Sequence, residues 1–206
     1  MNLFARRADY PITKLKETMS DRRQKTQLGA ALDRYQAGLA RDGDGRAFDL
    51  LYRRWHPKLL RLAIRLTRNP DEAQDVMQDA ALTMARNIRK LKDPALFSAW
   101  ACTIVRRRTA DHIDKAVRRR AAEADLPLTD LASGLGSGSG PDAALSLKQA
   151  LAQLPETDRL MLKLAYLDGF RGPEIAAALG IPVGTVKSRL FKARRALKAV
   201  YDPQSS

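Results

Sequence analysis

The chain lacks the residues from which several kinds of site are built. A single cysteine, Cys102, excludes an internal disulfide, and with only two histidines, His56 and His112, no Cys/His zinc cluster can be assembled. No apolar run approaches the roughly 20 residues that a membrane-spanning helix needs, and the first residues contain no apolar core of a secretory signal. We therefore expect a cytoplasmic protein without a metal or another cofactor.

The alternation of apolar and polar residues that marks a half-buried strand is also absent, and we predict an all-α fold. Apolar residues instead recur every three or four positions in stretches near 46–68, 70–88 and 97–105. Pro57 is expected to kink or restart the first of these helices. Asn69 before Pro70 predicts the N-cap of the second helix, and Asp93-Pro94 predicts the start of a third that runs towards Arg120.

Negative charge is scarce: 37 Lys and Arg face 23 Asp and Glu, which gives a net charge of +14. Such an excess favours a polyanionic partner, with nucleic acid the first candidate and an anionic membrane surface the second. Residues 121–141 contain no basic residue and end in alternating Gly and Ser, which predicts a flexible linker. The predicted parts are a disordered basic arm (1–27), a helical domain (28–120), the linker (121–141), a second helical domain (142–201) and a tail (202–206).

The segment "EIAAALGIPVGTVKSRLFKARRAL" (174–197) breaks a helix at Gly180 and restarts it with a basic residue on almost every turn. A helix, a tight glycine turn and a second, cationic helix predict a helix-turn-helix. The first helix is expected to pack through Ile175, Ala178 and Leu179 against Val186 and Leu190. The alternative is that the basic residues form only a solvated helix face. The outward residues would be Thr185, Lys187, Ser188, Arg189 and Lys192.

Two stretches carry a family resemblance. "LAQLPETDRLMLKLAYLDGFRGPEIAAALGIPVGTVKSRLFKARRAL" resembles region 4 of the extracytoplasmic-function (ECF) group of bacterial sigma factors. "AFDLLYRRWHPKLLRLAIRLTRNPDEAQDVMQDAALTMARNI" and "FSAWACTIVRRRTADHI" resemble their region 2, in the family's order and with the linker where the family has one. The resemblance implies a protein that binds core RNA polymerase, recognises the −35 and −10 promoter elements and helps to open the promoter.

The resemblance assigns the upstream (−35) element to the helix from Val183 to about Leu197. Base or phosphate contacts are implied for Lys187, Ser188, Phe191 and Lys192, and positioning on the DNA backbone for Thr185, Arg189, Arg194 and Arg195. Core packing of Phe191 is left open.

An acidic face raises a separate question, because Asp71, Asp75 and Asp79 lie four residues apart on one helix. The residues alone allow three explanations of this face: compensation of the helix dipole, a divalent metal site or a protein interface. The resemblance implies docking on the clamp helices of the largest polymerase subunit. Asp79 stands where the family usually has Glu. The implied contacts are Asp71, Glu72, Gln74, Asp75, Gln78 and Asp79.

For the −10 element the resemblance points to the loop Lys90–Leu96 and the helix that follows it. Unstacked bases are held by aromatic stacking and cationic grooves. Phe97 and Trp100 have helical spacing, so core packing is the alternative for both. The implied residues are Lys90, Lys92, Asp93, Phe97, Trp100, Arg106, Arg107 and Arg108.

The expected partners are promoter DNA, core RNA polymerase and an anti-sigma factor, with no membrane insertion, no small-molecule substrate and no catalytic residues. A stand-alone helix-turn-helix regulator is the alternative, although no heptad seam for a dimer is present. A nuclease or nucleotidyl transferase would instead need a metal at the acidic face around Asp75.

Overall fold

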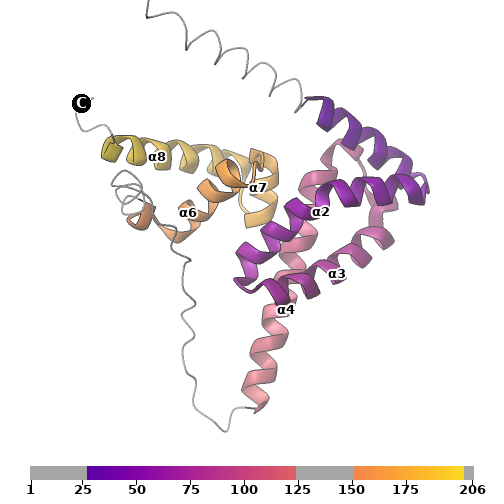
Figure 1. The fold of residues 1–206 in the computed structure, drawn as a ribbon, viewed down its shortest axis with the longest axis horizontal. Coiled ribbons are helices and arrows are strands. Elements are labelled where there is room, and N and C mark those ends of the chain that lie inside the picture. Colours follow the sequence, from indigo (N-terminus) through magenta and orange to yellow (C-terminus); the bar gives the residue numbers. More distant parts are fainter. Residues whose placement is uncertain (1–26, 124–150, 202–206) are drawn as a thin grey trace, which may run out of the picture. The chain divides into compact units, whose positions relative to one another are not determined.

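The computed structural model describes residues 27–123 and 151–201, and all regular structure within these ranges is helical, which confirms the all-α prediction. The basic arm and the Gly/Ser run from Ser133 to Gly140 lie outside the described residues. A helix over residues 27–41 precedes the labelled elements (Figure 1). These are α2 (Gly45–Thr67), α3 (Pro70–Asn87), η1 (Ile88–Lys90), η2 (Pro94–Leu96), α4 (Phe97–Glu123), α6 (Glu156–Leu162), η3 (Lys163–Leu167), α7 (Gly172–Leu179) and α8 (Val183–Tyr201).

The described chain divides into two compact units, and the division passes through α2 and the start of α4. The first unit holds the residues up to Leu51 together with Ile88–Phe97. Asp44 accepts hydrogen bonds from the backbone N–H groups of Arg46 (2.8 Å) and Ala47 (3.1 Å), and so caps the start of α2. Asp93 caps η2 in the same way, through the N–H of Ala95 at 2.9 Å.

The second unit begins at Tyr52 and contains most of α2, α3 and α4 as well as the C-terminal helices. Helix α2 continues through Pro57, so of the predicted kink or restart at this proline the restart is wrong. The predicted cap of α3 is confirmed: the Asn69 side chain accepts from the N–H of Asp71 at 2.9 Å. The residues that the three-to-four spacing assigned to the α3 core are buried, namely Ala73, Val76, Met77, Ala80 and Met84.

The C-terminal helices α6, α7 and α8 follow one another in Figure 1 in orange to yellow. Helix α6 ends in a π-helical turn, η3, in which the N–H of Asp168 reaches back to the carbonyl of Lys163 at 3.1 Å. Helix α7 packs against α8, and α6 packs against both η3 and α8. None of the described helices combines the length and apolar character needed to cross a membrane.

Candidate nucleic-acid interface

The turn between α7 and α8 depends on the backbone conformation of Gly180. Its φ of 70° lies in the left-handed region, which a residue with a Cβ adopts only at a cost. Its N–H donates to the carbonyl of Ala176, and the N–H of Ile181 reaches the same carbonyl at 3.1 Å. These bonds end α7 and leave only Ile181 and Pro182 before α8 begins at Val183. The structure therefore has the predicted helix-turn-helix.

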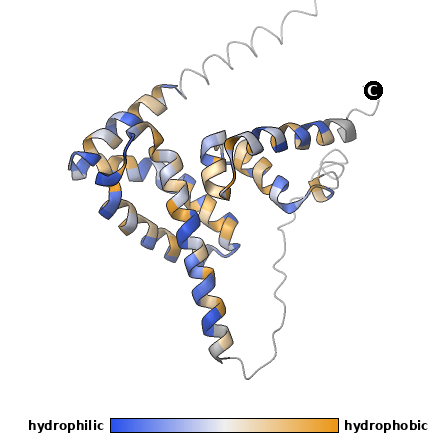
Figure 2. Cartoon of the chain, turned by 180° about the vertical axis from the view of Figure 1, so that it is seen from behind, coloured by the Kyte–Doolittle hydropathy of each residue, from blue (hydrophilic) through white to orange (hydrophobic). Residues whose placement is uncertain are grey.

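Helix α8 has one apolar face and one cationic face. Val186 and Ala193 are buried and Leu190 is half-buried, a spacing that turns this face inward. Most of the residues between them are polar or charged, and α8 carries successive blue, hydrophilic segments in Figure 2. The exposed set comprises Lys187, Ser188, Arg189, Phe191, Lys192, Arg194 and Arg195, and Thr185 is half-buried.

The exposure of Phe191 distinguishes between core packing and a position on the surface of α8. Its side chain is 60% exposed, so it lies on the cationic face and outside the core of the module. Core packing, the alternative left open for Phe191, therefore does not occur in this structure.

Three polar residues of α8 already have partners within the C-terminal helices. Arg189 faces the carboxylate of Asp158 on α6 at 3.7 Å. Arg194 donates through Nε to the carbonyl of Leu190 at 3.2 Å, and Ser188 donates to the carbonyl of Thr185 at 3.1 Å. The free cationic heads of the face are therefore chiefly those of Lys187, Lys192 and Arg195 among the described residues.

The acidic face of α3 is exposed at Asp71, Gln74, Asp75, Gln78 and Asp79. Glu72 is half-buried and lies 4.0 Å from the imidazole of His112. Within the described ranges, no three His, Cys, Asp or Glu side chains converge as a metal site would require. The face is therefore a carboxylate surface along one side of α3.

The residues expected at the −10 element differ in their accessibility. Lys90, Lys92 and Arg107 are exposed. Phe97 is 1% exposed, so its ring belongs to the core and cannot stack on a base in this structure. Trp100 is half-buried.

The two remaining arginines of this group are engaged elsewhere. Arg108 donates through Nε to the hydroxyl of Thr83 at 3.0 Å and pairs with Asp111 at 3.2 Å, so part of its role is structural. The guanidinium of Arg106 lies beside Gly180, with its Cζ 3.3 Å from where a Cβ on that glycine would stand.

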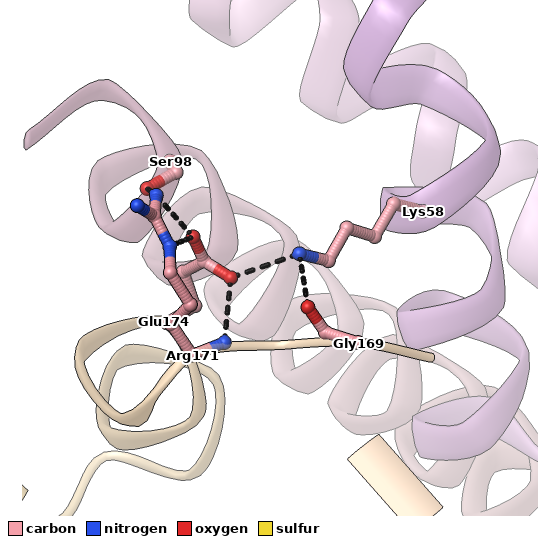
Figure 3. A network of polar contacts seen from close by, with 5 residues as sticks. All are labelled: Lys58, Ser98, Gly169, Arg171 and Glu174. Carbon is pink, nitrogen blue, oxygen red and sulfur yellow. Dashed lines mark hydrogen bonds and ion pairs between the residues drawn. The ribbon is translucent and has the colours of Figure 1, made fainter. Parts of the chain in front are cut away.

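A buried polar network was not anticipated from the sequence (Figure 3). Glu174 of α7 is 1% exposed and accepts from Lys58 of α2 at 2.9 Å. Its carboxylate also accepts from the backbone N–H of Arg171 at 2.9 Å and from the Arg171 guanidinium. Lys58 donates in addition to the carbonyl of Gly169 at 2.9 Å. The only signal in the sequence was the acidic residue in the first turn of α7.

The charge of Glu174 is maintained by its partners. Burial by itself raises the pKa of this carboxyl, but Lys58 and the hydrogen bonds from Arg171 outweigh burial and bring the pKa below its ordinary value. Burial, together with the nearby Glu174 carboxylate, raises the pKa of the Cys102 thiol to about 12. Cys102 is therefore held as an unreactive thiol at neutral pH.

Comparison with known proteins identifies the two modules. Residues 51–119 match the family described as sigma-70 region 2, and residues 144–197 match the family described as sigma-70, region 4. RNA polymerase sigma-H factor of Pseudomonas aeruginosa is 31% identical over 172 residues, which cover 78% of this chain and 89% of that protein. The chain belongs to the ECF family of RNA polymerase sigma factors.

Other members of the family show comparable similarity to this sigma factor. The ECF sigma factor SigM of Mycobacterium tuberculosis is 34% identical over 155 residues, covering 75% of this chain and 77% of SigM. The ECF sigma-E factor of Escherichia coli is 32% identical over 174 residues, covering 78% of this chain and 90% of that protein.

Solved structures of sigma factors share the fold. The structure of CnrH in complex with the cytosolic domain of CnrY has a TM-score of 0.53 and 26% identity, and covers 84% of this chain and 99% of CnrH. The sigma factor RpoE was solved in complex with the anti-sigma factor NepR from Bartonella quintana. This structure has a TM-score of 0.51 and 25% identity, and covers 76% of this chain and 98% of that chain. As a sigma factor this chain is not an enzyme, but a factor that selects promoters for the polymerase.

Proposed function

We propose that α8 binds the −35 element in the major groove and that its exposed cationic face makes the contacts. The observation that carries this proposal is the left-handed Gly180, after which α8 presents Lys187, Phe191 and Lys192 on one exposed side. A helix of this width fits the major groove, and lysine can bind guanine edges or phosphates there. Arg194 and Arg195 contact the DNA backbone, while Arg189 orients α8 through Asp158 of α6.

The −10 element is assigned to the module that matches region 2. Lys90 and Lys92 precede η2 and are exposed, and Arg107 is exposed on α4. These three cations contact phosphates of the opened strand. Of the two aromatic residues assigned to this element, only Trp100 is partly accessible. Asp93 shapes the loop by capping η2, and Phe97 supports it from the core.

The exposed carboxylate face of α3 is the proposed contact with core RNA polymerase. Asp75 and Asp79 stand one helical turn apart and are exposed, and Gln74 and Gln78 lie beside them. Asp71 also lies at the N-terminal end of α3, where the helix dipole stabilises its charge. A partner with basic residues at matching spacing would complement this face.

The domain boundaries remain those expected from the sequence: a region 2 domain over 28–120 and a region 4 domain over 142–201, joined by the 121–141 linker. The family matches to 51–119 and 144–197 support this division.

A tether turns the second promoter contact into an intramolecular event and so raises the effective affinity. We place the factor in the cytoplasm, where its polymerase and promoters are. We also propose an anti-sigma partner, because the similar sigma factor RpoE was solved in complex with the anti-sigma factor NepR.

Reconstituted transcription tests the proposal. The purified chain is added to core RNA polymerase with a library of promoter fragments, and the new transcripts are mapped. Promoter-dependent transcripts with a shared upstream element are expected, and Lys187→Ala with Lys192→Ala should reduce them at least about tenfold, the effect of removing one to two good base or phosphate interactions. The matched control is Arg118→Ala with Arg119→Ala, which removes two exposed positive charges from α4. Tight duplex binding by the chain alone, with no polymerase-dependent transcripts, would instead identify a stand-alone regulator.

A further inference from the structure

The loop assigned to the −10 element is built together with a helix that precedes the region 2 match. Residues 88–97 form one compact unit with the described residues up to Leu51, whereas the family match begins only at residue 51. The helix over residues 27–41, at the indigo end of the chain in Figure 1, therefore belongs to the same unit as the loop Lys90–Leu96. The assignments made above give this helix no task.

Two glycines bring the end of this helix into contact with the loop. A Cβ on Gly38, in the last turn of the helix, would stand 4.0 Å from Cγ of Pro94 in η2. Gly43 follows the helix with a φ of 112°, and the guanidinium of Arg89 in η1 lies 3.3 Å from its Cβ position. A side chain at Gly43 would be strained by this φ and would press on that guanidinium, so glycine permits the close approach. The loop is thus held against the helix at two points.

Tyr35 is the aromatic side chain that this arrangement leaves accessible. It lies one turn before Gly38 on the same side of the helix, and so stands next to the contact with Pro94. Ala37 and Ala40 are buried and fix the helix in the unit, whereas the side chain of Tyr35 is 66% exposed. An aromatic ring is therefore presented to solvent beside the loop.

The surroundings of Tyr35 match the chemistry of a single-stranded nucleotide. Such a nucleotide is bound by an aromatic ring that stacks on its base and by cations that meet its phosphate. Lys90 and Lys92 of the same unit are exposed, and Leu96 adds apolar surface after η2 because it is also largely exposed. Phe97 is buried in the core and cannot supply the ring.

We propose that Tyr35 stacks on a base of the opened promoter strand while Lys90 and Lys92 hold the adjoining phosphates. The inference rests on the proposed function, because it adds an aromatic partner to the loop assigned to the −10 element. Every base has a face on which a ring can stack, so Tyr35 contributes affinity for the separated strand more than choice of sequence. In a duplex the bases are stacked on one another, so the ring binds the product of strand separation and favours opening.

Paired removal of the ring and of single bases tests this contact. Holoenzyme is assembled from core RNA polymerase and the wild-type chain or Tyr35→Ala. It is titrated, by fluorescence anisotropy, with fork-junction DNA of a promoter found by transcript mapping. Each nucleotide of the single-stranded −10 segment is made abasic in turn. Tyr35→Ala should weaken binding to the intact fork at least about fivefold, the effect of losing one stacked base.

The decisive result is a coupling at one nucleotide. There, the abasic fork should bind the wild type several-fold more weakly than the intact fork does, but should cost Tyr35→Ala nothing further, because both changes remove the same contact. Tyr35→Phe keeps the ring and should restore most of the lost affinity. Leu28→Ala is the matched control, since it removes another exposed side chain from the same helix, and it should bind the intact fork as the wild type does. A loss that is equal at every abasic position, or that Leu28→Ala shares, would assign Tyr35 to a protein contact and overturn the proposal.

Lys90→Ala with Lys92→Ala separates this proposal from the assignment of the loop. If the lysine variant binds the fork weakly and the Tyr35 cycle shows no coupling, the stacking proposal is overturned and the loop assignment stands. If the cycle shows coupling and the lysine variant binds as the wild type does, the contact of the ring stands and the assignment of the lysines to phosphates is overturned.

Discussion

At the scale of single residues, burial separates side chains that the sequence treated alike. Phe97 and Phe191 both stood in helices with basic neighbours, and both were open to core packing or to base contact. Phe97 is 1% exposed and Phe191 is 60% exposed, so the first supports the loop before α4 and the second meets solvent on α8. Spacing along the helix gives the face of a residue, but only its neighbours in space decide what covers that face.

Glu174 gives the residue-scale prediction. Glu174→Gln keeps an oxygen for the backbone N–H of Arg171 but leaves Lys58 without its counter-charge, so the free energy of unfolding should fall by about 2 kcal/mol at neutral pH. Because the folded-state pKa lies below the ordinary value of 4.5, the carboxylate stabilises the fold above about pH 4.5. That contribution is lost as the pH falls through the lowered folded-state pKa.

Thermal unfolding of both proteins across this pH range measures the effect. The difference in Tm should stay constant from about pH 7 to about pH 5 and shrink at lower pH. Asp114→Asn, at an exposed position of α4, is the control and should change Tm little throughout. A Tm difference that grows on acidification would contradict the assigned direction of the pKa shift.

At the scale of the element, caps and turns explain where the helices begin and end. Asn69 and Asp93 were recognised from the sequence as helix starts, and both side chains accept a backbone N–H at 2.9 Å. Asp93 caps the short 3-10 helix η2, however, and the predicted third α-helix, α4, begins only at Phe97. Each cap joins residues only two or three positions apart, so the residues that form it can be recognised from the local sequence. The cap of α2 by Asp44 belongs to the same class and follows the same Asx pattern.

The left-handed Gly180 makes a prediction for the helix-turn-helix. Gly180→Ala should lower the free energy of unfolding by about 1–2 kcal/mol, because an L-residue with a Cβ is strained at a φ of 70°. Gly184 is a matched control in the first turn of α8, with nothing within 4 Å of its Cβ position, so Gly184→Ala should be neutral or stabilising by about 0.5–1 kcal/mol. Urea unfolding measures both, and equal effects would show that backbone conformation is not the cause.

The acidic face of α3 makes the second prediction at this scale. Asp75→Lys with Asp79→Lys should abolish co-purification with core RNA polymerase, because two attractive contacts become repulsive. Both side chains are exposed, so the helical content measured by circular dichroism should be unchanged. Asp114→Lys on α4 is the control and should still co-purify. Full retention of the double variant on the polymerase would remove α3 as the docking surface.

At the scale of the whole molecule, the net charge of +14 is divided among surfaces with different tasks. Lys187, Lys192 and Arg195 of α8 face solvent. Lys58 and Arg65 of α2 are instead paired with the carboxylates of Glu174 and Asp168. A total charge predicts attraction to DNA, but the free cations determine how many counterions are released on binding.

The salt dependence of promoter binding tests this division. Lys187→Ala with Lys192→Ala should reduce the slope of log affinity against log salt by about one unit for each phosphate that the variant no longer binds. The control Arg118→Ala with Arg119→Ala removes the same net charge and should leave the slope closer to that of the wild type. Equal reductions would assign the slope to net charge alone and would count against α8 as the contact surface.

Local patterns in the sequence were enough to specify the helices, their caps, the glycine turn and the cationic side of α8. Each follows from residues within about four positions of one another, so the pattern is complete in the chain. The family resemblance rests on the same local patterns, and the matches to sigma-70 regions 2 and 4 confirm it.

The division of the charges into free and paired groups came from the packing of the helices. Lys58 and Glu174 are 116 positions apart, and nothing in either local pattern indicates the other. The same holds for Arg106 beside Gly180 and for Arg65 with Asp168. Contacts between distant residues depend on how the helices pack, and that packing selects among many pairings that the composition alone allows.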